Sequence, residues 1–175
     1  SPNFLNFCIE FIKLKTKQRS QRRSINMYFV DREAIEDKLH YLVRQIDLFE
    51  EKGSFDQSAY DQLILERLAH TMIDAVLDIG NAMIDGFIMR DPGSYEDIID
   101  ILVDEQVIDT DMETPFKAML PFRKILVQDY THTEHGELLA AVRENLSAFK
   151  AYPEKISAYL EKELGVVTAF IPRES

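Results

Sequence analysis

Hydrophobic residues recur at helical spacing along most of this chain. The first clear run lies between Asp31 and Gly53, where apolar residues return every three or four positions and place one side of a helix in contact with a core: Ile35, Leu39, Leu42, Val43, Ile46 and Phe49. Asp31 is suited to cap the first turn, and Val30 and Ile35 to pack across it as a hydrophobic staple. The pattern therefore predicts an amphipathic helix that ends before Gly53.

A second and more apolar helix is predicted over roughly residues 58–89. Ser58 and Asp61 have the spacing of a capping box at its start, and Asp91-Pro92-Gly93 stops it. Apolar residues between Leu63 and Phe87 cover more than one face. A helix of this kind packs centrally or against a partner subunit, so we expect one of these two positions.

The next two predicted helices are shorter. A Ser-x-x-Asp pattern that begins at Ser94 caps a helix through about Glu105. After a polar loop, Pro115 is suited to the first turn of a helix that ends near Val127. Pro121 lies inside that helix and predicts a kink.

The last predicted helix follows the polar segment 131–137 and starts at Leu138. Pro153 is expected to bend or break it, and residues 166–175 are expected to add at most one short extended piece. Together the patterns predict an all-α fold, an up-and-down antiparallel bundle of about five helices.

Composition supports one globular domain in this chain of 175 residues, because 46% of the residues are hydrophobic and 29% are charged. The single cysteine, Cys8, excludes an intramolecular disulfide and a four-thiolate zinc site. No apolar run approaches the ~18 residues that a membrane span needs. The first residues place apolar before basic side chains, the reverse of a signal peptide, so we expect a cytoplasmic protein without membrane contact.

Charge divides the chain into two parts. Residues 1–26 carry six basic side chains and one acidic, whereas residues 27–175 carry 14 basic and 30 acidic. We interpret residues 1–26 as a basic N-terminal extension and residues 27–175 as the helical domain. Because the acidic domain repels phosphate backbones, nucleic-acid binding would need a local basic groove.

Most familiar catalytic patterns are missing from the sequence. No glycine-rich phosphate loop, no His-Glu-x-x-His pair and no Gly-x-Ser-x-Gly elbow is present. Two groups of polar residues are interpreted as solvated surface and not as metal ligands: the acidic group Asp100, Asp104, Glu105, Asp109 and Asp111, and the pair His132 and His135. No cofactor or metal is therefore expected, and His40 and His70 receive no functional role.

The segment Pro121–His132, with the sequence PFRKILVQDYTH, is the best candidate for chemistry. Arg123 and Tyr130 are seven residues apart and would share a face if the helix continued to Tyr130. A guanidinium suits a phosphate because it is always charged and offers a planar fork of donors, while Gln128 and Tyr130 add hydrogen-bonding groups. The alternative is structural: Arg123 pairs with a surface acid and Tyr130 caps the core.

The run Phe122–Tyr130 resembles the motif of the HepT-like family of the HEPN superfamily, in which an arginine is followed by a histidine, one residue and a tyrosine. The apolar stretch Ala75–Ile84 is also similar to the family's second helix. The likeness covers residues 27 to about 163. These proteins are small dimeric helical bundles that include toxin components of bacterial toxin–antitoxin pairs.

The resemblance implies a metal-independent ribonuclease site at the interface of a homodimer. Arg123 would stabilise the phosphate, and Tyr130 would be adenylylated by a nucleotidyltransferase antitoxin. Gln128 takes the place of the family's histidine. Because an amide does not titrate near neutral pH, the loss of general acid–base help lowers the rate by ~10²–10⁴-fold.

The leading hypothesis is therefore a HepT-like, toxin-type component with weakened or lost ribonuclease activity, whose site residues are Arg123, Gln128 and Tyr130. Two rival hypotheses stay open. One is a non-catalytic dimeric module that binds another protein. The other is a module that binds a nucleotide or RNA through Arg123 without cleaving it.

Overall fold

The structure is a computed structural model that describes residues 30–165. The predicted extension at residues 1–26 and the extended piece at residues 166–175 lie outside that range. Within it the chain forms no strand, two short 3₁₀ turns, η1 (Thr110–Met112) and η2 (Tyr130–His132), and five helices: α2 (Arg32–Lys52), α3 (Ala59–Gly86), α4 (Tyr95–Asp104), α5 (Glu113–Gln128) and α6 (His135–Leu164). The predicted all-α bundle is confirmed.

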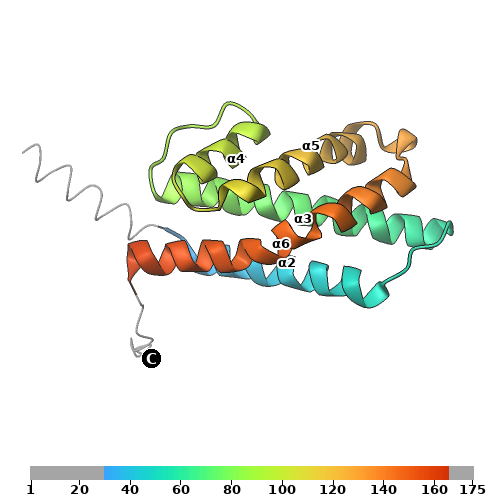
Figure 1. Ribbon diagram of the computed structural model, residues 1–175, viewed down its shortest axis with the longest axis horizontal. Coiled ribbons are helices and arrows are strands. Elements are labelled where there is room, and N and C mark those ends of the chain that lie inside the picture. Colours follow the sequence, from blue (N-terminus) through green and yellow to red (C-terminus); the bar gives the residue numbers. More distant parts are fainter. Residues whose placement is uncertain (1–29, 166–175) are drawn as a thin grey trace, which may run out of the picture.

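Helix α3 occupies the centre of the bundle and contacts the other four helices. Figure 1 shows α4 and α5 on one side of α3 and α2 on the other, while α6 starts beside the end of α5 and crosses over to run alongside α2. Most apolar residues of α3 are buried by these neighbours. Of the two positions expected for the second helix, the structure shows the central one, and only Tyr60, Leu63 and Ile64 stay exposed near its start.

The N-caps explain where three helices begin. Asp31, Ser58 and Ser94 each accept a hydrogen bond from the backbone amide three residues further on, at 3.0–3.2 Å. These bonds satisfy amides that have no partner inside the helix. Gly53 ends α2 with a φ of +66°, a conformation that favours glycine. Helix α3 ends at Gly86, three residues earlier than predicted.

Helix α6 differs from the prediction at two points. It begins at His135, earlier than Leu138, and it continues without a break through Pro153. Tyr152 and Ile156 are fully buried on either side of the proline. Their packing against the core holds the helix together although proline removes one backbone hydrogen bond.

The core joins α3 tightly to α4 and α6. At Gly80 an added Cβ would lie 2.8 Å from the Cγ2 atom of Ile98, so only glycine allows α4 to approach this closely. On the α6 side, the hydroxyl of Tyr152 donates a hydrogen bond of 2.9 Å to the carbonyl oxygen of Val76. Burial raises the pKa of this phenol well above its usual value.

Candidate functional site

Arg123 lies on α5 and is held by side chains of two other helices. Its Nε atom donates a hydrogen bond of 2.7 Å to Oδ1 of Asp74 on α3. Its guanidinium carbon lies 4.5 Å from the centre of the Tyr95 ring, at the start of α4. A cation over an aromatic face is attracted by the ring's quadrupole. No other partner of this guanidinium is found among residues 30–165, which leaves its two terminal nitrogens available.

Asp74 connects Arg123 to a histidine. The second carboxylate oxygen of Asp74, Oδ2, lies 2.9 Å from Nε2 of His70, one turn earlier on α3. The side chains of His70, Asp74 and Arg123 are 28%, 34% and 24% exposed, respectively. A ligand from solvent can therefore reach all three groups.

A polar row continues along α3 from this cluster. It consists of Glu66, His70 and Asp74, which are four residues apart and so lie near one another on the helix surface. At its far end, Oε1 of Glu66 lies 2.6 Å from Nε2 of His135, in the first turn of α6. The polar row thus contacts Arg123 at one end and His135 at the other.

Gln128 and Tyr130 lie where α5 ends. Gln128 is the last residue of α5 and is exposed, and Tyr130 begins the turn η2 with 66% of its surface exposed. Because α5 stops before Tyr130, the shared helical face predicted for Arg123 and Tyr130 does not form. The structural alternative holds only in part, since Arg123 does pair with an acid but Tyr130 does not cap the core.

The two downstream histidines behave differently. His132 is exposed in η2, where its Nδ1 atom lies 3.0 Å from the hydroxyl of Thr131, so its surface position is as predicted. His135 was expected in a surface loop, and that expectation is wrong. The residue opens α6 and is only partly exposed, because Glu66 of the neighbouring helix holds its ring.

The acidic group around residues 100–111 is partly paired with lysines. Asp100 contacts Lys117, and Asp109 lies 2.5 Å from Lys155. The carboxylates of Asp100 and Glu113 raise the pKa of Lys117 above its usual value. Within residues 30–165 no group of three or more histidine, cysteine or acidic side chains is arranged to hold a metal ion. Over the same residues, no helix is both long and apolar enough to cross a membrane.

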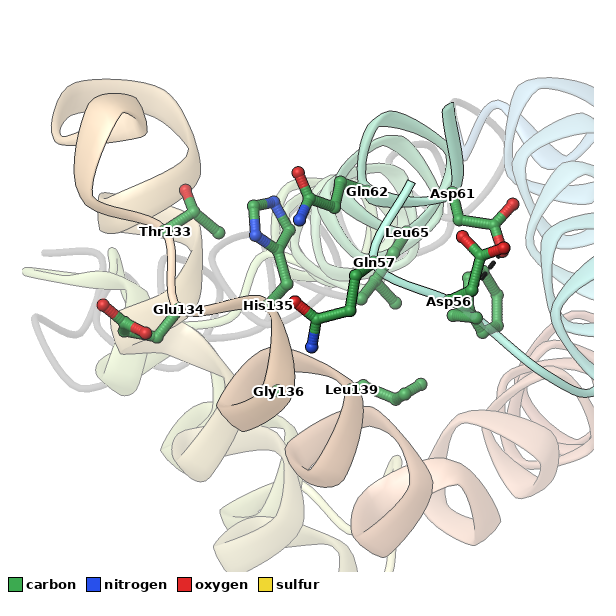
Figure 2. A pocket seen from close by; sticks show the side chains of 11 residues that line it. Asp56, Gln57, Asp61, Gln62, Leu65, Thr133, Glu134, His135, Gly136 and Leu139 are labelled. Atoms are coloured by element: carbon green, nitrogen blue, oxygen red, sulfur yellow. Dashed lines mark hydrogen bonds between the residues drawn. The ribbon is translucent and has the colours of Figure 1, made fainter. Parts of the chain in front are cut away.

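A pocket of about 350 Å³ opens between the start of α3 and the start of α6. Figure 2 shows that its walls carry many polar side chains, with His135 beside Gln62 and Thr133. Three carboxylates, those of Asp56, Asp61 and Glu134, border it. A hydrogen bond from Lys52 lowers the pKa of Asp61 below its usual value. An acidic pocket repels phosphate, so it is a poor site for RNA.

Three residues of the site were missed by the sequence analysis: His70, Asp74 and Tyr95. The spacing of His70 and Asp74, one helical turn apart, was visible in the sequence. Their contact with Arg123 was not, because 49 residues separate Asp74 from Arg123 along the chain. Only the packing of α3 against α5 brings them together.

The bundle and the segment at the end of α5, an arginine followed by Gln128 and Tyr130, define an all-α protein of the HEPN-like class. A match to a family profile then identifies the family within this class. The profile for "Ribonuclease HepT-like" matches residues 8–156, and the chain therefore belongs to the HepT-like ribonuclease family.

Related proteins agree with this assignment. "Putative RNase YutE" of Bacillus subtilis (strain 168) is 46% identical over 144 residues, which are 82% of this chain and 99% of YutE. The solved structure of that cytosolic protein has a TM-score of 0.76 and covers 81% of this chain and 99% of its own.

Two solved toxin–antitoxin structures share the fold at 21% identity. One contains AMP-PNP and has a TM-score of 0.64, and the other is a mutant of MntA-HpeT with a TM-score of 0.62. Each covers 72% of this chain and 98% of the matched chain. At this identity they support the fold alone.

Proposed function

We propose that this protein is a cytoplasmic, metal-independent RNA-cleaving component of a toxin–antitoxin pair, with activity lowered by Gln128. Membership of the HepT-like ribonuclease family supports the reaction class. The observation that carries the proposal is the position of Arg123. Asp74 and Tyr95 hold its side chain in place, while its terminal nitrogens stay available. Those nitrogens suit a phosphodiester, whose charge rises during cleavage.

The acting form is a homodimer in which two copies of Arg123 border one cleft. On α3 the exposed Leu63 lies seven residues before His70 and so shares a face with it, and the exposed Tyr60 lies about one turn before Leu63. Apolar side chains beside a charged cluster suit the core of a subunit interface. Two guanidinium groups there supply the positive groove that the acidic domain otherwise lacks.

The partner is a nucleotidyltransferase that adenylylates Tyr130. This phenol is 66% exposed and begins the turn directly after α5, so an enzyme can reach it. Its test is the intact mass of the protein after incubation with a candidate nucleotidyltransferase and ATP. We expect one AMP adduct that is lost in Tyr130→Phe and kept in Tyr41→Phe, a control at an exposed tyrosine on α2 that lies outside the proposed interface. An adduct that persists in Tyr130→Phe contradicts the assignment.

The proposed cleavage is tested with labelled RNA in the presence of a chelator. Native protein, Arg123→Ala and Gln128→His are compared, and Arg44→Ala serves as the matched control because Arg44 is exposed on α2 and lies outside the site. We expect slow native cleavage, loss of it in Arg123→Ala, and a gain of ~10²-fold or more in Gln128→His.

A second function is favoured by one observation, the amide of Gln128 in the place of a titratable side chain. If native protein binds RNA without cutting it and Gln128→His cuts in an Arg123-dependent way, the native protein is a disarmed, RNA-binding member of the family. If neither form cuts and both bind another protein instead, the ribonuclease proposal is wrong.

A further inference from the structure

We propose that His70 is the catalytic proton-transfer group of this protein and acts in place of the imidazole that Gln128 lacks. The inference rests on the proposed ribonuclease function and names a residue for it. Its basis is geometric: one carboxylate, that of Asp74, contacts both the guanidinium of Arg123 and the imidazole of His70, at 2.7 and 2.9 Å.

The register of the helices places His70 at nearly the same height along the bundle as Gln128. From Arg123 to His135 the chain moves forward, while its partners on α3 move back from Asp74 to Glu66, so α5 runs antiparallel to α3. The colours of α3 and α5 in Figure 1 also run in opposite directions. From Arg123 to Gln128 α5 rises about 7.5 Å, and from Asp74 back to His70 α3 rises about 6 Å. His70 therefore lies at nearly the same level as Gln128.

The imidazole has a nitrogen free for chemistry. With the Asp74 carboxylate 2.9 Å from Nε2, the neutral ring carries its proton on Nε2 and presents an unprotonated Nδ1. No other partner of the ring is found among residues 30–165. The side chain is 28% exposed, so a substrate held by Arg123 can reach it.

Charged groups around the ring come from several helices. Asp74 belongs to the same helix, and so does Glu66, which His135 of α6 engages. Helix α3 also carries Arg67 and Asp78, and Asp78 pairs with Lys38 of α2. Arg123 of α5 pairs with Asp74 and lies over the Tyr95 ring of α4.

The proposed step needs no metal and no oxidant. The 2′-oxygen of the RNA attacks the adjacent phosphorus, so an O2′–P bond forms, and the 2′-hydroxyl proton passes to Nδ1 of His70. The P–O5′ bond then breaks, and the imidazolium returns the proton to the leaving 5′-oxygen. The products are a 2′,3′-cyclic phosphate and a 5′-hydroxyl, while Arg123 stabilises the charge on the phosphoryl oxygens.

The test measures cleavage rates between pH 5 and 8 for native protein, His70→Asn and the matched control His132→Asn, an exposed histidine. Binding to an RNA with a 2′-deoxy cleavage site is measured in parallel. We expect His70→Asn to bind as native protein does but to cut ~10²–10⁴-fold more slowly. Its residual activity should lack the decline toward acid pH that a histidine base imposes. Adding Gln128→His to His70→Asn should restore cleavage.

Four results overturn the inference and separate it from the proposed function. If His70→Asn cuts with the native rate and pH profile while Arg123→Ala does not, His70 is not catalytic but the ribonuclease proposal stands. The same conclusion holds if His70→Asn is slow with an unchanged pH profile. If native protein is inactive and Gln128→His is active, His70 is not catalytic and the native protein is the disarmed, RNA-binding member of the family. If neither native protein nor Gln128→His cuts, the ribonuclease proposal fails and the role of His70 fails with it.

Discussion

At the scale of single residues, both oxygens of the Asp74 carboxylate are engaged, one by Arg123 and one by His70. These contacts are partly exposed, so we expect Asp74→Asn to lower the free energy of unfolding by no more than about 1 kcal/mol. Cleavage should fall by roughly tenfold or more, because both functional groups lose their orientation. Asp78→Asn, which removes the exposed contact with Lys38, is the control for urea unfolding and activity. Equal loss of activity in both variants contradicts this role.

The ionisation of Asp97 makes the free energy of unfolding depend on pH. The guanidinium of Arg90, followed by the amide of Gly93, lowers the pKa of Asp97 to about 2. Because the unfolded chain has a value of about 3.9, the ionised carboxylate stabilises the fold above that pH, and the contribution is lost as the pH falls toward 2. Urea unfolding should therefore show a weaker acid dependence for Asp97→Asn than for native protein. Asp85→Asn, at an exposed carboxylate, should retain the native dependence.

The candidate site was predictable from the sequence only in its α5 component. Arg123, Gln128 and Tyr130 belong to one short motif whose spacing is visible. Tyr95 was not foreseen, because its contact with Arg123 depends on where α4 lies against α5. No local pattern contains that information.

At the scale of elements, the starts of several helices could be predicted because the capping side chain lies within four residues of the amide that it binds. Ser58 and Ser94 capped the helices that their sequence predicted. The start of α6 at His135 did not follow, because a contact with Glu66 on another helix stabilises that turn. Pro153 was expected to bend or break α6, and long-range packing around it prevents the break.

The close approach of α3 and α4 gives a prediction about packing. In Gly80→Ala the new methyl would collide with Ile98, and we expect a loss of roughly 1–3 kcal/mol in the free energy of unfolding. The displaced α4 should also weaken cleavage, because it carries Tyr95. Gly136→Ala is the matched control, since no atom lies within 4 Å of its Cβ and alanine favours the helix by up to about 1 kcal/mol. Urea unfolding of both variants checks the pair, and a Gly80→Ala variant as stable as native protein contradicts the packing argument.

At the scale of the whole molecule, most of the apolar residues of α3 that suggested a subunit interface are buried inside the bundle. What remains on α3 is the exposed cluster of Tyr60, Leu63 and Ile64. Leu63 is 62% exposed, so a lysine there should leave the fold intact. We expect Leu63→Lys to convert the dimer to monomer in light-scattering measurements at micromolar concentration. Leu48→Lys, on the exposed side of α2, should stay dimeric. Native protein that runs as a monomer contradicts the proposed assembly.

The proposed ribonuclease function depends most directly on one ratio, the rate of RNA cleavage by Gln128→His divided by that of the double variant Gln128→His, Arg123→Ala, both in chelator. Both variants carry the histidine at position 128, so they differ only at Arg123. The ratio therefore measures the contribution to cleavage of the arginine that Asp74 and Tyr95 hold in place. We predict a ratio of about 10² or more, with 2′,3′-cyclic phosphate ends on the product. A ratio near one, or no cleavage by either form, would contradict it.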